Sequence, residues 1–293
     1  MNEFLELLDK KVAHLCEKKT ALILSGGIDS ALLCALMPKH CEFTAYTVTV
    51  GEAPDLKFAR MVAEQYDVAL EIIELNDEIV DRELEHLLPT IKKFQGDVSP
   101  VRVGAEFPTY FAAKAAAADG YKVALSAQGP DEMFGGYARY MEVAKNGGYP
   151  AIEKILHDDS IELQGEIIAI DKAVCALHGI ELREPMLEDD FIEFGLSIPI
   201  EKRFYFEKKT PDYPFEEFED FKVVRKLCEK VAAEEVLPKE LVWRPKKAAQ
   251  YGSGVHKALD RLARKYDYKK KARELGSKHY LSMFLEDRLG GKV

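Results

Sequence analysis

Residues 22–30 read Leu-Ile-Leu-Ser-Gly-Gly-Ile-Asp-Ser, an apolar run that breaks into a loop with two glycines and is followed by a helical pattern. Where a strand gives way to a helix, backbone N–H groups and the positive end of the helix dipole converge, so the joint can bind an anion. No lysine follows the glycines at the spacing of the common P-loop, and that motif occurs nowhere else in the chain. The stretch therefore predicts a phosphate-binding loop of another kind.

Three residue types in this loop suit phosphate chemistry. Gly26 and Gly27 let the backbone approach phosphate oxygens closely, and the hydroxyl groups of Ser25 and Ser30 can donate hydrogen bonds to them. Asp29 repels phosphate, but it can hold Mg²⁺, which in turn bridges phosphate oxygens. The alternative interpretation of a glycine pair is a tight turn that leads into a capped helix N-terminus.

The surrounding sequence alternates between strand and helix patterns. Strands are predicted at residues 20–24, 43–50, 68–75 and 122–126. Helices are predicted at residues 3–18, 29–37, 54–66, 77–95 and 107–119. This alternation predicts an α/β fold, in which a parallel twisted sheet carries helices on both faces. Ligands of such sheets bind beyond the carboxyl ends of the strands.

The pattern changes at about residue 145. Beyond that point it is mostly helical, without a clear alternation of strands. We expect residues 1–145 to form the α/β core that carries the glycine loop. Residues 146–293 are expected to form a mostly helical part that completes the substrate site.

Composition and charge narrow the class of protein. The 293 residues are 47% hydrophobic and 31% charged, as in soluble globular proteins, and the net charge of −10 argues against general binding to nucleic acid. No apolar run approaches the length of a membrane span, and the acidic N-terminus does not resemble a signal peptide. The five cysteines form no C-x-x-C pair, so neither a zinc site nor a disulfide framework is indicated. We expect a cytoplasmic protein.

A second glycine-rich loop follows the strand predicted at residues 122–126. Residues 126–137 read Ser-Ala-Gln-Gly-Pro-Asp-Glu-Met-Phe-Gly-Gly-Tyr, and both loops can face one site because both follow strands. The first loop resembles the SGGxDS signature of the PP-loop ATP pyrophosphatases, which cleave ATP to AMP and pyrophosphate. The second loop resembles the SGEGxDExFGGY loop of the asparagine synthetase family, whose relatives include beta-lactam synthetase.

The resemblance to this family extends from about residue 20 to residue 256 and implies the PP-loop (HUP-like) fold. It implies that Asp29 and Asp131 are Mg²⁺ ligands at the pyrophosphate of ATP, which agrees with the preference of Mg²⁺ for carboxylate oxygens. It also implies that Ile23 and Val48 flank the adenine and that Ser126 contacts the nucleoside through its backbone. The implied nucleotide-binding set is Ile23, Ser25, Gly26, Gly27, Asp29, Ser30, Val48, Ser126, Ala127 and Gly129.

Two basic residues receive roles from the same resemblance. Lys246 lies in Trp243-Arg-Pro-Lys246 and matches the family's catalytic lysine, which stabilises negative charge on the α-phosphate and on the tetrahedral intermediate. Lys247 is a near alternative. Arg183 belongs to the segment 179–187 and is expected either to neutralise the carboxylate of an amino-acid substrate or to form a structural salt bridge.

The chain departs from the family at Gln128. The asparagine synthetases carry glutamate there, and that residue is implicated as the base that deprotonates the attacking nitrogen. An amide cannot act as such a base, and beta-lactam synthetase, which also lacks the glutamate, uses a tyrosine-centred arrangement. Glu106, Glu132 and Tyr110 are candidate replacements, with an exposed loop glutamate as the alternative interpretation of Glu106.

A second departure concerns the source of nitrogen. Glutamine-using members begin Met-Cys and carry an N-terminal glutaminase domain, whereas this chain begins Met-Asn and reaches its phosphate loop by residue 25. The glutaminase domain is therefore expected to be absent. Nitrogen is expected from free ammonia, from a partner glutaminase or from an amine on the substrate.

The resemblance implies an ATP-dependent, amide-forming ligase that activates aspartate or a related amino acid as an acyl-adenylate. Two other classes stay open: a PP-loop enzyme that modifies RNA, and a nucleotide-binding homologue without catalytic activity. The expected ligands are ATP, Mg²⁺ and a small amino acid, with no nucleic acid and no membrane. A homodimer is among the open oligomeric states.

Overall fold

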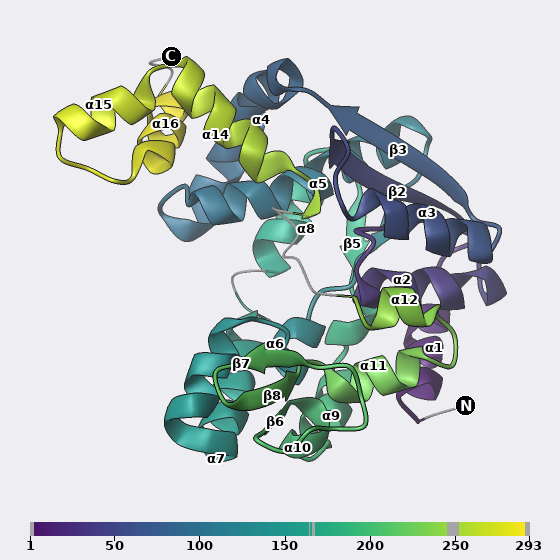
Figure 1. Ribbon diagram of the computed structural model, residues 1–293. Helices are drawn as coiled ribbons and strands as arrows, with labels where there is room; N and C mark the ends of the chain where they lie inside the picture. The colour runs from purple at the N-terminus through teal and green to yellow at the C-terminus, as the bar shows by residue number, and fades with distance from the viewer. Residues whose placement is uncertain (1–2, 164, 166–167, 245–251, 291–293) are drawn as a thin grey trace.

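A computed structural model of the chain shows that the four predicted strands are neighbours in one parallel sheet (Figure 1). The structure describes residues 3–163, 165, 168–244 and 252–290. The sheet has five strands in the order β3-β2-β1-β4-β5. These are β1 (Lys19–Ile23), β2 (Glu42–Val50), β3 (Ala69–Leu75), β4 (Val123–Leu125) and β5 (Glu181–Arg183). The predicted α/β fold is confirmed.

Helices connect and cover these strands. They are α1 (Glu3–Leu15), α2 (Ile28–Leu36), the 3₁₀ turn η1 (Met37–Lys39), α3 (Leu56–Gln65), α4 (Asp77–Gln95), α5 (Pro100–Ala118), α6 (Pro130–Phe134), α7 (Arg139–Glu162), α8 (Ile168–Ala176), the 3₁₀ turn η3 (Pro185–Leu187), α9 (Asp189–Ser197), α10 (Ile200–Arg203), α11 (Leu227–Ala233), α12 (Lys239–Val242), α14 (Val255–Lys265), α15 (Tyr268–Glu274) and α16 (Tyr280–Leu289). Within the described ranges, no helix has the length and apolar character needed to cross a bilayer.

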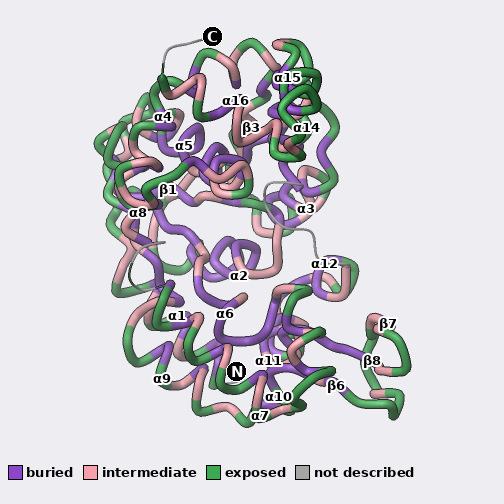
Figure 2. Tube along the Cα trace, turned by 90° about the vertical axis from the view of Figure 1, so that its left-hand side faces the viewer, coloured by how far each residue is buried: buried purple, intermediate pink, exposed green. Residues whose placement is uncertain are grey.

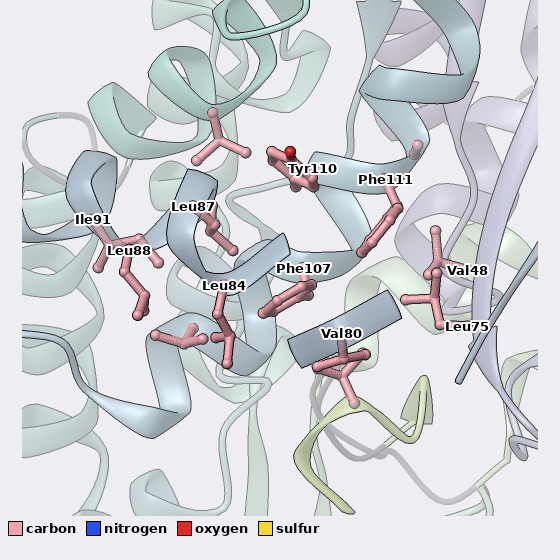
Figure 3. Packing of buried hydrophobic residues seen from close by; sticks show 14 of the residues in the cluster. Val48, Leu75, Val80, Leu84, Leu87, Leu88, Ile91, Phe107, Tyr110 and Phe111 are labelled. Carbon is pink, nitrogen blue, oxygen red and sulfur yellow. The ribbon is translucent and has the colours of Figure 1, made fainter. Parts of the chain in front are cut away.

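Alternate residues of a strand point to opposite faces of the sheet. Each face is buried in its own hydrophobic core. Ala21 of β1 belongs to a core with α4, α5, α8 and α14, whereas Leu22 belongs to a core with α1, α2 and α3. Figure 3 shows the first core, where Leu84 of α4 and Phe107 of α5 lie close together. Because helices cover both faces of the sheet, the sequences of β1 and β4 are nearly continuous apolar runs.

The chain after residue 145 contributes strands that the sequence pattern did not indicate. β5 pairs with β4 and so extends the parallel sheet. A separate antiparallel sheet has the order β6-β8-β7, with β6 (Tyr205–Glu207), β7 (Glu216–Phe218) and β8 (Phe221–Val224). Strands of three or four residues are too short to show a period of two, which explains why a mostly helical part was predicted.

Two further groups of helices lie in different parts of the molecule. Helices α14 and α16 pack against α4 and α5, while α7 and α10 pack on the small antiparallel sheet (Figure 1). Figure 2 shows that α2 runs through the buried interior, whereas β7 lies at the exposed rim of the molecule. Both glycine-rich loops therefore extend from strands of a sheet that is packed on both faces.

We predict that Gly26→Ala will destabilise the fold strongly. Gly26 has a φ of 75°, and a Cβ placed there would lie 2.4 Å from the carbonyl oxygen of Asp55. Gly120 is a matched control, because its φ is 85° but a Cβ would meet nothing within 4 Å. Gly120→Ala should cost about 1–3 kcal/mol from backbone strain alone, and Gly26→Ala clearly more in chemical denaturation. Equal losses for the two variants would contradict this account.

Candidate functional site

The two glycine-rich loops meet at the carboxyl ends of β1 and β4. From β1 the chain continues to β2 on one side, and it later returns to β4 on the other side, so the strand order reverses between β1 and β4. Such a switch point opens a crevice beyond the strand ends. Here the crevice is a cavity of about 270 Å³. The sequence-predicted residues that line it are Ile23, Ser25, Gly27, Asp29, Ser30, Glu106, Ser126, Ala127, Gln128, Gly129, Asp131 and Glu132.

The first loop is closed by its own serines. The hydroxyl groups of Ser25 and Ser30 lie 3.0 Å apart, and Ser30 donates to the carbonyl oxygen of Gly27 at 3.2 Å. Gly27 is the N-cap of α2 and has no side chain that could cap the helix. The first turn of α2 therefore presents backbone N–H groups at the mouth of the loop, where an anion is favoured.

A buried lysine joins the two loops. The Nζ atom of Lys226 lies 2.5 Å from Oδ1 of Asp29 and 2.7 Å from Oδ1 of Asp131. Glu229 Oε2 is 3.5 Å from the same nitrogen. Burial opposes the ammonium form, but the charges of Asp131 and Asp29 hold the pKa of Lys226 well above its usual value. Two loops and the start of α11 thus converge on one cation.

The local backbone is shaped for this contact. Lys226 precedes α11 with a φ of 55°, and its N–H donates to the carbonyl oxygen of Phe134 at 3.0 Å. A Cβ at Gly136 would lie 1.8 Å from Oδ1 of Asp131 and 2.6 Å from Cε of Lys226. The second glycine of the Phe-Gly-Gly-Tyr segment is therefore required by the close approach of this ion pair.

The same oxygens suit Mg²⁺. Carboxylate oxygens of Asp29 and Asp131 converge on one cationic group, which is presently the ammonium of Lys226. Mg²⁺ in nucleotide sites is commonly held by one or two carboxylates together with phosphate oxygens and water. Over the described ranges, no three His, Cys, Asp or Glu side chains are arranged to hold a metal unaided. Phosphate oxygens would have to complete the coordination.

A second polar cluster lies in the wall of the cavity. Gln128 Nε2 donates to Oδ2 of Asp171 at 2.9 Å, and Arg102 Nη1 donates to Oε1 of Glu106 at 3.3 Å. Burial and the neighbouring charge of Asp171 raise the pKa of Glu106 well above its usual value. Glu106 is only 1% exposed and lies inside α5, so the interpretation as an exposed loop glutamate is wrong.

Glu184 stands next to this cluster. Ser126 Oγ donates to its Oε1 at 3.1 Å, while its Oε2 has no hydrogen-bond donor within the described part of the chain. Burial, helped by the charge of Asp171, raises the pKa of Glu184 to about 8. The carboxyl group is therefore largely protonated near neutral pH.

Further cations line the cavity. Arg225 donates to Glu216 and to the carbonyl oxygen of Gly136 at 2.7 Å. Burial lowers the pKa of Lys230 to about 8, against the charge of Glu216. Arg244 Nη1 lies 2.8 Å from Oδ1 of Asp55. Guanidinium groups can bind phosphate oxygens in place of their carboxylate partners.

Several sequence-predicted residues lie elsewhere. Arg183 donates to Glu17, to Glu181 and to the carbonyl oxygen of Leu15, and it does not line the cavity, so the salt-bridge alternative is the one present. Val48 is buried in the core, and Gly26 contributes backbone geometry instead of cavity surface. Lys246 and Lys247 fall outside the described residues.

Lys226 and Asp171 were not predicted from the sequence. Both lie in the second half of the chain, and neither stands in a glycine-rich or otherwise distinctive motif. A sequence signal for Lys226 would have been the charged pair Arg225-Lys226 directly after a β-branched run. Asp171 interrupts an apolar helix, which is a weak hint of a polar partner in the core.

Comparisons with known proteins show which family the chain resembles. A family model described as asparagine synthase matches residues 3–160 and 144–292. The putative glutamine-hydrolyzing asparagine synthetase 1 of Methanocaldococcus jannaschii is 33% identical over 272 residues, which cover 86% of this chain and 49% of that protein. The glutamine-hydrolyzing asparagine synthetase of Rattus norvegicus is 28% identical over 248 residues, which cover 80% of this chain and 40% of that protein. The chain spans about half the length of these relatives, or less.

Solved structures match this chain as well. Among them is the NH3-dependent NAD synthetase from Campylobacter jejuni, at 17% sequence identity and a TM-score of 0.30. The match covers 72% of this chain and 96% of that chain.

We predict that Lys226→Met will destabilise the ligand-free protein by about 1–3 kcal/mol, because it leaves two partly buried carboxylates without their cation. Denaturant unfolding at neutral pH measures this loss, and added Mg²⁺ should restore part of it. Lys57→Met is the matched control, since Lys57 and its partner Glu240 are both exposed, and it should change stability little. Similar losses in both variants would refute the role given to Lys226.

We predict a pH-dependent gain of stability for Glu184→Gln. Between pH 4.5 and about 8, the unfolded chain loses the Glu184 proton while the folded protein retains it, so this group destabilises the fold as pH rises. The free energy of unfolding of the variant should therefore exceed that of the wild type by an amount that grows with pH, to roughly 1–3 kcal/mol at pH 8. Glu181→Gln, three residues earlier and exposed, should show no such gain. A pH-independent difference for Glu184→Gln would contradict the prediction.

Proposed function

Because this chain belongs to the asparagine synthase family, which uses ATP, we propose that it is an ATP-dependent ligase that forms amide bonds. In the proposed reaction, a carboxylate is activated as an acyl-adenylate with release of pyrophosphate, and a nitrogen nucleophile then displaces AMP. The observation that carries the proposal is the convergence of Asp29 and Asp131, from separate loops, on one cation beside the open N-terminus of α2. Aspartate or a related amino acid is the proposed carboxylate.

In the first step, an oxygen of the substrate carboxylate attacks the α-phosphorus of ATP, and the bond to the pyrophosphate oxygen breaks. The leaving pyrophosphate gains negative charge, which the N–H groups of the α2 N-terminus and the hydroxyls of Ser25 and Ser30 can stabilise. Bound Mg²⁺, held by Asp29 and Asp131, would neutralise further phosphate charge. Lys226 keeps these two carboxylates close together.

In the second step, the nitrogen lone pair attacks the carbonyl carbon of the adenylate, and the carbon–oxygen bond to AMP breaks. We propose ammonia as the nucleophile, either free or delivered by a separate glutaminase. Lys246, which matches the family's catalytic lysine, stays the predicted partner of the negative charge on the α-phosphate. The nitrogen must also lose a proton, which Gln128 cannot accept.

We predict that the protein will exchange labelled pyrophosphate into ATP when a suitable amino acid is present. A panel that begins with aspartate identifies the carboxylate. Asp29→Asn and Asp131→Asn should each lower the exchange rate by about 10²-fold or more, because each removes charge that positions the polyphosphate.

The control for this assay is Arg183→Ala, which removes an ion pair outside the cavity and should leave the exchange unchanged. ATP binding without exchange for any carboxylic acid would overturn the proposal and favour a nucleotide-binding protein without catalytic activity. Exchange that depended on added RNA would favour an RNA-modifying enzyme instead.

A further inference from the structure

Two buried carboxyl groups from different helices face each other in the cavity wall. Glu106 of α5 is 1% exposed and Asp171 of α8 is 2% exposed, and both line the cavity. Their carboxyl groups lie within hydrogen-bonding distance of each other. Apart from this mutual contact, Arg102 donates to one oxygen of Glu106, and Gln128 donates to one oxygen of Asp171.

One oxygen of this pair is left without a protein donor. Within the described ranges, Glu106 Oε2 receives no hydrogen bond, although it is fully buried. A buried polar atom without a partner is costly, and it is found where a ligand or a proton completes the arrangement. Because Oε1 already accepts from Arg102, the remaining oxygen can carry the proton that Glu106 shares with Asp171.

Two carboxyl groups this close cannot both be ionised next to a single guanidinium group. Burial raises the pKa of both residues, and the charge of Asp171 raises that of Glu106 further. Hydrogen bonds from Glu106 and Gln128 favour the ionised form of Asp171. These opposing influences favour a single proton on Glu106 and an ionised carboxylate on Asp171. A carboxylate in such a dry setting is a stronger base than one in water.

The position of this pair is informative because Asp171 contacts residue 128 directly, at 2.9 Å. Residue 128 lies in the second loop, beside the site proposed for the adenylate, and here it is an amide. We propose that the Glu106–Asp171 pair accepts the proton of the nitrogen nucleophile during amide formation. This inference rests on the proposed function. Gln128 then acts as a positioning residue that orients Asp171.

The nitrogen lone pair forms the bond to the acyl carbon, and the carbon–oxygen bond to AMP breaks with its electron pair on the phosphate oxygen. One N–H proton passes to the carboxyl pair, which becomes neutral. The products are the amide and AMP, and the proton is later released to solvent.

The other candidates for this role are less well placed. Tyr110 donates its hydroxyl to Glu83 and does not line the cavity. Glu132 lines the cavity, but it accepts the hydroxyl of Tyr137 at 2.6 Å and neighbours Asp131, at the end assigned to phosphate.

The test separates the two half-reactions in Asp171→Asn and Glu106→Gln. Pyrophosphate exchange, with the amino acid that gives the strongest exchange in the wild type, should persist in both variants. Amide formation with ammonia should fall by about 10²–10⁴-fold, the usual contribution of a general base. Trapping of the adenylate by hydroxylamine should stay near the wild-type rate, because hydroxylamine is unprotonated at neutral pH and highly nucleophilic.

A rescue variant distinguishes catalysis from structure. Gln128→Glu in the Asp171→Asn background returns a carboxylate to the same contact and should restore much of the ammonia-dependent rate. Glu83→Gln is the matched control, because Glu83 is also a buried carboxylate but lies outside the cavity, and it should not alter the ratio of ammonia to hydroxylamine rates.

Exchange intact with unchanged amide formation in both variants would overturn this inference and leave the proposed function standing. Equal losses with ammonia and hydroxylamine would also overturn it, since they would indicate a structural defect. Absence of exchange in the wild type with every carboxylic acid would overturn the proposed function, and this inference with it.

Discussion

The ion pair of Lys226 with Asp29 and Asp131 connects the parts of the molecule that form the site. It joins the loop after β1, the loop after β4 and the start of α11, which are far apart in sequence. Bringing these charges out of water is costly, and the attraction compensates only when the geometry is close. The glycine at position 136 permits that geometry, since any Cβ there would collide with both Asp131 and Lys226.

The charges around Lys226 do not cancel. Burial, together with the charge of Asp29, raises the pKa of Glu229 well above its usual value, which favours its neutral form. One ammonium then faces two partly buried carboxylates, which leaves a net negative charge at the wall of the cavity. Such a charge favours the arrival of another cation, and a magnesium–nucleotide complex would bring one. This charge is consistent with the proposed ligand, a nucleotide whose phosphates carry a metal.

The cavity has two chemically different regions. Asp29, Asp131 and Lys226 surround the region proposed for phosphate, whereas Glu106 and Asp171 form a carboxyl pair in another part of the wall. Gln128 belongs to the second loop and contacts the carboxyl pair, so one loop reaches both regions. A ligase of the proposed kind needs both: fixed charge for adenylation and a proton acceptor for the nitrogen.

Much of the fold could be predicted from local sequence, because a long segment with a regular apolar period indicates whether it forms a helix or a strand. The strands predicted at residues 43–50 and 68–75 and the helix at 77–95 agree with β2, β3 and α4 to within one residue at each end. The short strands β5 to β8 could not be predicted, since three residues show no period and depend on their neighbours for pairing. Glu106 was expected in a loop or near one, yet α5 begins at Pro100 and continues through Pro108.

The sequence by itself determined that two glycine-rich loops follow strands and carry Asp29 and Asp131, because the residues that form each loop are consecutive in the chain. It also determined that residue 128 is an amide. Only the tertiary structure decided that Lys226 stands between those aspartates, that Asp171 contacts both Gln128 and Glu106, and that Arg183 is held in a salt bridge. These facts depend on which distant segments the parallel sheet and its helices bring together, and a side chain's partner across 40 or more residues leaves no local pattern.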